Sequence, residues 1–105
     1  MSDIVNPIWF GLFTVTGPKE NEMLGGDAGA CLWIAAQAED EAKLRARVDF
    51  IMRDLGLTVV EAEHLQEVQD EDDLSEQVSR LIPQARRDVE SVVCGTWHKF
   101  KYHDA

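Results

Sequence analysis

The chain of 105 residues has few cysteines and no long apolar run. Its two cysteines, Cys31 and Cys94, lie far apart and form no Cys-x-x-Cys pair, so neither a disulfide framework nor dithiol redox chemistry is indicated. No apolar stretch approaches the ~20 residues that span a bilayer. The residues up to Pro7 lack the positive charges that open a secretory signal. We therefore expect a cytoplasmic protein with buried, reduced thiols and no membrane partner.

Basic residues are also scarce. Ten Lys and Arg residues stand against twenty Asp and Glu residues, which gives a formal net charge of -10. Such a surface repels the phosphates of nucleic acids and anionic lipids, and at physiological salt it attracts basic proteins over about 8 Å. The composition therefore disfavours a nucleic-acid partner and favours a basic protein partner.

The imbalance is greatest between Glu61 and Glu76, where the sequence has eight carboxylates and no Lys or Arg. Within this acidic segment we predict a partner-binding surface that includes Glu61, Glu63, Asp70, Asp72 and Asp73. The run Asp70–Asp73 can also cap a following helix, and the two roles are compatible. It lacks the alternating spacing and the glycine of a calcium loop, so we expect no metal there.

Enough apolar sequence remains for one core. Hydrophobic residues make up 45% of the chain, which is ordinary for a globular protein, and the length is near the commonest size of a domain. We therefore expect a single α+β domain over residues 1–105 that folds without metal or disulfide bonds.

The first half of the chain predicts two strands and a helix. The segment Ile8–Thr16 is aromatic and β-branched with apolar residues on both alternating faces, which suits a strand covered on both sides or one whose outer face meets a partner. A second strand is predicted over residues 30–37, most simply antiparallel to the first. A helix follows, with Asp40 as its N-cap and Gly56 as the residue that ends it.

The second half predicts a strand, an interrupted helix and a last strand. Residues 58–65 form the third strand, and apolar residues recur at helical spacing over residues 74–89. Pro83 lies inside that stripe, so we expect a kink or two short helices, with Pro83 opening the second. The last strand covers residues 92–102 and is interrupted or bulged at Gly95.

The resulting order is β-β-α-β-α-β. We expect a two-layer α/β sandwich, in which two helices lie on one face of a four-stranded, mixed or mostly antiparallel sheet. The segment from the second to the third strand has the length of a right-handed crossover that joins parallel strands. These building blocks resemble a ferredoxin-like arrangement, although the order of elements departs from the simple form. A likeness of this kind carries no function.

No set of residues indicates catalysis, a metal or a cofactor. Cys94 and His98 would share a face of an extended strand with their Cα atoms roughly 13 Å apart, too far for one zinc ion, and we expect His103 in a frayed terminus. His64 has no assignable nucleophile beside it. The glycines at positions 25, 26 and 29 lead from strand to strand, unlike a loop that holds phosphate at a helix N-terminus.

The aromatic residues indicate an interface. All fall in predicted strands except Phe50, and most are expected in the core. Because one face of a two-layer sheet lacks helices, we expect some of Trp9, Phe13, Trp33 and Trp97 to be exposed on that open side. Such a cluster would serve as an interface or a ligand groove, and homodimerisation through the open face is one use of it.

Three functions remain open at this stage. The first is a non-enzymatic protein-binding domain, in one form an inhibitor or immunity-type protein that covers the basic active site of a toxin or nuclease. The alternative is a homodimeric small-ligand-binding or regulatory domain. The third is a small enzyme that uses His64 or His98 with a nearby carboxylate. The acidic segment and the lack of a catalytic set favour the first.

Overall fold

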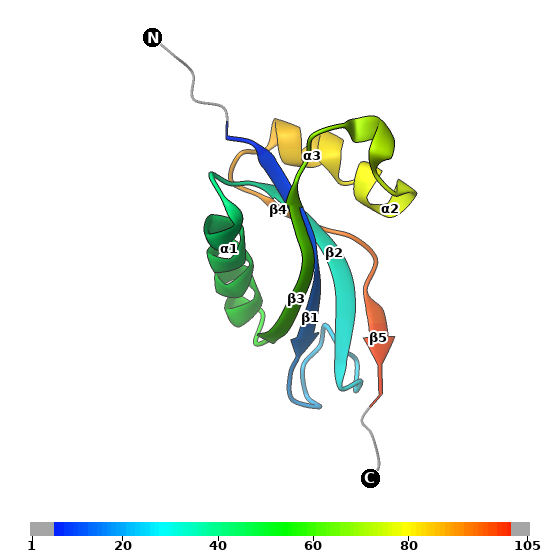
Figure 1. The fold of residues 1–105 in the computed structure, drawn as a ribbon. Helices are drawn as coiled ribbons and strands as arrows, with labels where there is room; N and C mark the ends of the chain where they lie inside the picture. Colours follow the sequence, from blue (N-terminus) through cyan, green and yellow to red (C-terminus); the bar gives the residue numbers. More distant parts are fainter. Residues whose placement is uncertain (1–5, 102–105) are drawn as a thin grey trace.

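The computed structural model describes residues 6–101 of the chain as an α+β fold (Figure 1). The elements along the chain are β1 Ile8–Thr16, β2 Gly29–Gln37, α1 Glu41–Asp54, β3 Thr58–Glu67, the 3-10 turn η1 Glu71–Asp73, α2 Glu76–Ser79, α3 Ile82–Arg87, β4 Val92–Cys94 and β5 His98–Phe100. The expected β-β-α-β-α-β order is confirmed, with α2 and α3 as the second helical element. His103 and Tyr102 lie outside the described residues.

The sheet is open and antiparallel, with the strand order β3-β1-β2-β4. β5 pairs with β2 beside β4, so these two short strands follow one another along the same edge of β2. The expected interruption at Gly95 is therefore confirmed. Because β2 and β3 both run antiparallel to β1, they are parallel to each other, with β1 between them. The segment through α1 thus joins two parallel strands that are not neighbours.

α1 forms as its sequence predicts. The carboxylate of Asp40 accepts a hydrogen bond from the backbone N–H of Lys43 at 2.8 Å, which caps the first turn. At the other end, Gly56 has a φ of 78°, and its N–H donates to the carbonyl of Arg53. Only a residue that tolerates this left-handed conformation ends a helix in this way.

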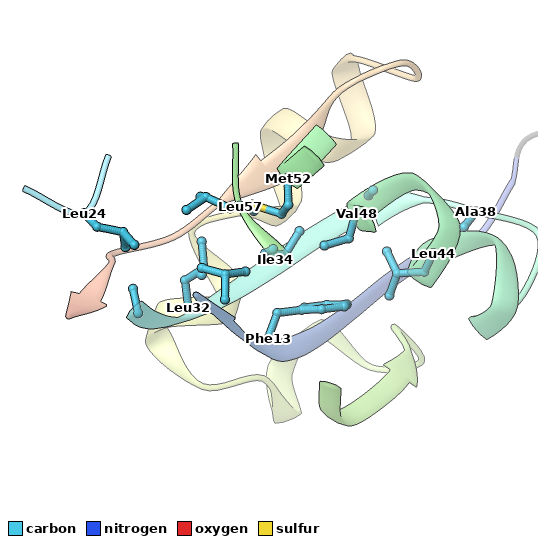
Figure 2. Close-up of a cluster of buried hydrophobic side chains, with 12 residues drawn as sticks. Phe13, Leu24, Leu32, Ile34, Ala38, Leu44, Val48, Met52 and Leu57 are labelled. Atoms are coloured by element: carbon cyan, nitrogen blue, oxygen red, sulfur yellow. The ribbon is translucent and has the colours of Figure 1, made fainter. Parts of the chain in front are cut away.

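α1 covers one face of the sheet. Figure 2 shows Leu44, Val48 and Met52 of α1 pointing down onto side chains of β1 and β2. All three are fully buried, as are Phe13, Leu32 and Ile34 beneath them. This is the main hydrophobic core, and burial of each such side chain stabilises the fold by roughly 1.5–3 kcal/mol.

The expectation that both helical elements lie on one face is wrong. The α2–α3 unit packs against the opposite face, where Val78, Leu81, Ile82 and Ala85 meet Ile8, Phe10, Ala35 and Val93. The reason is the apolar character of β1 on both sides: its first half leaves Ile8 and Phe10 on the second face, and these must be covered. Figure 1 shows α2 and α3 near one end of the sheet, while α1 lies along its other side.

Pro83 breaks the second helical element as expected. It lies in the first turn of α3, where its missing N–H costs no helical hydrogen bond. The preceding helix α2 is only one turn long, and its N-cap is Ser75, whose hydroxyl accepts from the N–H of Val78 at 3.3 Å. The acidic run Asp70–Asp73 does not cap this helix directly. It forms the separate turn η1, which Asp70 caps.

Candidate functional site

The half of the sheet face that α2 and α3 leave uncovered carries polar side chains. In an antiparallel sheet, directly paired residues share a face. Thr14 pairs with Glu61 on β3 and with Cys31 on β2, and Cys31 in turn pairs with His98 on β5. The adjacent row contains Glu63, Leu12 and Trp33. We call these seven residues the open face.

The open face brings Glu61 and Glu63 together. Their carboxyl groups interact, and the hydrogen bond and the repulsion from Glu63, together with slight desolvation, raise the pKa of Glu61. Two like charges held side by side favour any cation that approaches them. The imidazole of His64 lies 4.0 Å from the carboxylate of Glu63, and both side chains are exposed.

A pocket of about 290 Å³ lies next to the open face, between the end of β3, the η1 turn and α2. We call it the acidic pocket. Its apolar lining comes from Phe10, Trp33, Leu74 and Val78, and its polar lining comes from Gln66, Glu67, Gln69, Asp70, Asp73 and Ser75. Trp33 belongs to both the open face and the pocket, so the two surfaces are continuous.

The aromatic part of the pocket is held in place by packing. Phe10 is buried against α2 and α3, and its ring centroid lies 6.0 Å from that of Trp33 at an interplanar angle of 53°. Such a tilted pair is a favourable arrangement of two aromatic rings. The Trp33 ring also lies 6.2 Å from that of His64 on β3. Trp33 is half-buried, so part of its surface remains available to a ligand.

The acids around the pocket are not neutralised by the chain's own cations. Arg86 pairs with Glu71, and Arg80 pairs with Glu76 at 2.6 Å. Within residues 6–101, no Lys or Arg forms an ion pair with the remaining acids of the segment, which are Glu61, Glu63, Glu67, Asp70, Asp72 and Asp73. Arg45, which lines a separate hollow together with Glu61, pairs with Glu41 on its own helix at 3.9 Å.

The predicted partner-binding residues are therefore distributed unevenly. Glu61 and Glu63 lie on the open face, and Asp70 and Asp73 line the acidic pocket beside it. Asp72 instead borders a separate hollow with Glu71, Glu76 and Arg80. Phe10, Leu74 and the glutamines could not be predicted as part of the site, because nothing in their local sequence pattern shows that β1, β2 and the η1 turn meet. The apolar outer face of β1 was the one available signal.

Of the four aromatics considered for the open side, Trp33 lies there. Trp9, Phe13 and Trp97 pack with the core beneath α1. The indole N–H of Trp9 is buried and has no hydrogen-bond partner among the residues that the structure describes. The expectation that some of these four residues lie on the open side is thus confirmed by Trp33.

Cys94 and His98 lie on opposite faces, contrary to the expectation for one continuous strand. Cys94 packs under α1 with Ile34, whereas His98 pairs with Cys31 on the open face, because the chain changes course between β4 and β5. Burial raises the pKa of the Cys94 thiol. In the part of the chain that the structure describes, no group of three or more His, Cys, Asp or Glu side chains could hold a metal ion.

Neither histidine of the described chain forms a catalytic pair. No hydrogen bond within residues 6–101 joins His64 or His98 to a hydroxyl or thiol group. The hydroxyl of Thr14 and the thiol of Cys31 form a hydrogen bond with each other, at 3.3 Å. None of the helices in the described residues is both long and apolar enough to cross a bilayer.

Comparison with protein-family models, with curated proteins and with solved structures finds no match to this chain.

Proposed function

We propose that this protein is a non-enzymatic, cytoplasmic binding domain whose open face and acidic pocket dock a basic protein partner. One concrete form is an inhibitor or immunity-type protein that covers the cationic active site of a toxin or nuclease. One observation carries the proposal. Carboxylates that pair with no Lys or Arg within residues 6–101 lie next to the half-buried Trp33 on one side of the molecule.

Charge and apolar area have different roles in such a complex. The carboxylates steer a basic partner to this side of the molecule and raise the association rate. Leu12 and Trp33 supply apolar area at the centre, where tryptophan is enriched among residues that dominate binding energy. Repulsion between Glu61 and Glu63 is relieved when a cation binds, so part of the driving force is already present in the free protein.

Homodimerisation through the open face is the alternative. A two-fold dimer whose axis passes near Glu61 and Glu63 would bring these residues close to the same residues of the other copy, and like charges in an interface cost several kcal/mol. Leu12 and Trp33 are the features that favour a dimer. Light scattering at micromolar concentration separates the two functions, since a stable dimer supports a dimeric ligand-binding or regulatory domain.

The test of the proposal is charge reversal on the open face with a matched control. The variant Glu61→Lys/Glu63→Lys should lose a partner that copurifies from the native cell, and this partner should be basic and bind more weakly as salt rises. The control, Glu39→Lys/Asp54→Lys, makes the same change in net charge at exposed positions that flank α1. Equal binding by both variants, or an affinity that does not depend on salt, would contradict the proposal.

A further inference from the structure

The acidic pocket is large enough to hold a long side chain. Its volume of about 290 Å³ lies at the lower limit of the ~300–1,000 Å³ typical of small-molecule sites. It has an aromatic wall on one side, where Phe10 and Trp33 meet, and a rim of carboxylates and amides on the other. A long side chain fits this space and a folded segment does not, while the acidic rim repels the phosphate of a nucleotide.

The rim can accept several hydrogen bonds from a cation. The amide of Gln69 donates to the carboxylate of Glu67 and orients it. One oxygen of Asp70 accepts from the N–H of Asp72 at 2.9 Å, which leaves its second oxygen available. The carboxylate of Asp73 accepts no hydrogen bond within residues 6–101, and no Lys or Arg lines the pocket. The acceptors therefore outnumber the donors on the pocket's rim.

We propose that the acidic pocket is the anchor site for an arginine side chain of the basic partner. This inference rests on the proposed function and names the group that the partner inserts. The guanidinium plane stacks on the indole of Trp33, and its N–H groups reach the carboxylates of Asp70 and Asp73. A buried arginine set against an aromatic ring is a common energetic centre of protein interfaces.

Arginine fits this pocket better than lysine does. A guanidinium is planar, loses less hydration on burial than an ammonium, and presents five donors in a fixed fork. The aromatic face of the pocket can stack on the guanidinium plane while the carboxylates accept hydrogen bonds from its N–H groups. A lysine ammonium would use the charge alone, so arginine should bind several-fold more tightly.

The inference can be tested without the natural partner. The labelled protein is titrated with N-acetyl-arginine-methylamide and followed by the NMR signals of the Trp33 indole and the Gln69 side-chain amide. The dissociation constant is expected to be on the order of 1 mM, as for other ligands of this size. N-acetyl-lysine-methylamide should bind several-fold more weakly, and N-acetyl-citrulline-methylamide, which has a similar shape without charge, should leave both signals unmoved.

Two variants give the matched control. Asp73→Asn removes a charge from the rim and should weaken arginine binding about fivefold, as expected for the loss of a charge-assisted hydrogen bond near the surface. Asp72→Asn removes the same charge one residue away, outside the pocket, and should leave binding unchanged. Equal effects of the two variants, shifts spread over all acidic residues, or equal binding of the arginine and citrulline compounds would overturn the inference. Equal binding of arginine and lysine would overturn the assignment to arginine.

Failure of this inference is distinguishable from failure of the proposed function. A basic partner that depends on Glu61 and Glu63, together with no arginine-induced shift, would remove the anchor site alone. Arginine binding in the pocket without any partner that depends on the open face would remove the proposed function alone.

Discussion

Trp33 of β2 and His64 of β3 bring their rings to a centroid distance of 6.2 Å although β1 lies between their strands. A bulge in β3 accounts for this contact. The pairing of β1 with β3 shifts register between Phe10 and Leu12, so β3 has an extra residue there, and His64 adopts a φ of 54° within it. Bulges of this kind re-aim a side chain, and here the imidazole contacts the tryptophan that joins the open face to the acidic pocket.

The left-handed backbone conformation of His64 predicts that replacing this residue lowers the stability of the fold. Left-handed conformation costs an ordinary residue roughly 1–2 kcal/mol, and a β-branched residue more. His64→Val should therefore lower the free energy of unfolding by at least about 1 kcal/mol in urea titrations, whereas His64→Gly should lower it less. The control Thr58→Val, at an exposed position of the same strand with ordinary backbone, should be nearly neutral. If His64→Val left the free energy of unfolding unchanged, the bulge would relax without cost.

Gln37 gives a second prediction, because it is the buried polar side chain that ties α3 to the sheet. Its amide donates to the carbonyls of Ala85 and Arg86 at 3.0 and 3.1 Å, which satisfies the last turn of α3. Gln37→Met keeps the volume and leaves those carbonyls without this donor, so it should destabilise the fold by about 1–3 kcal/mol.

The measurement is again denaturant unfolding, with Gln84→Met as the control. Gln84 is exposed on α3, and its replacement should change the free energy of unfolding by less than about 0.5 kcal/mol. If the two variants unfold at the same midpoint, the hydrogen bonds of Gln37 contribute nothing net.

Local sequence signals predicted the elements that depend on their own residues. Asp40 and Gly56 delimit α1 because capping needs only the backbone beside it, and Pro83 separates α2 from α3 for the same reason. The helical stripe of Leu44 and Val48 likewise showed which side of α1 is buried. In each case, the information lies within one turn of chain.

Signals that depend on distant segments were missed. The periodicity of Val78 and Ile82 shows that they share a buried side, but not which face of the sheet they cover. The decisive observation is the apolar outer face of β1 at Ile8 and Phe10, which needed a cover that α1 could not provide. The acidic pocket was missed for the same reason: its aromatic wall and its carboxylate rim come from segments far apart in the sequence.

The interaction between the carboxyl groups of Glu61 and Glu63 on the open face predicts that the stability of the fold depends on pH. The hydrogen bond and repulsion from Glu63 raise the pKa of Glu61 in the folded protein above the ordinary value of a glutamate side chain. The folded state thus holds this proton more tightly than the unfolded state does. The resulting stabilisation is fully present below the unfolded pKa and is lost as the pH rises through the raised folded pKa.

Glu61→Gln should therefore raise the melting temperature more at pH 7 than at pH 4, because it removes the repulsion from Glu63 that disfavours the ionised form of Glu61. The control Glu39→Gln removes one exposed carboxylate away from the open face and should show a smaller difference between the two pH values. The melting temperatures can be measured by calorimetry. An identical shift for Glu61→Gln at both pH values would contradict a repulsion between the ionised pair.

The two thiols should differ in reactivity. Burial raises the pKa of Cys94, which packs beneath α1, so little of its reactive thiolate forms at neutral pH. Cys31 lies on the open face, half-buried beside Thr14. Alkylation of the folded protein followed by mass spectrometry should label Cys31 faster than Cys94, and the difference should disappear in denaturant. Faster labelling of Cys94 in the folded protein would show that β4 opens readily.

Gly29 is the position where the sheet tolerates a side chain least. A Cβ atom there would lie 2.2 Å from the carbonyl oxygen of Val15 and 2.5 Å from the ring of Phe100, which pairs with Gly29 from β5. The backbone of β1 cannot move away without breaking its pairing. Gly29→Ala should therefore cost at least about 2 kcal/mol and release β5 from the edge of the sheet.

Gly11→Ala is the matched comparison, since its Cβ would meet the end of the Leu65 side chain at 2.4 Å. A flexible side chain can move to another rotamer, so this variant should be destabilised less than Gly29→Ala. Hydrogen exchange of the β5 amides reports the local effect, because they should lose protection in Gly29→Ala and keep it in Gly11→Ala. Equal loss of stability in the two variants would show that β1 accommodates the added methyl group and that the clash at Val15 is not decisive.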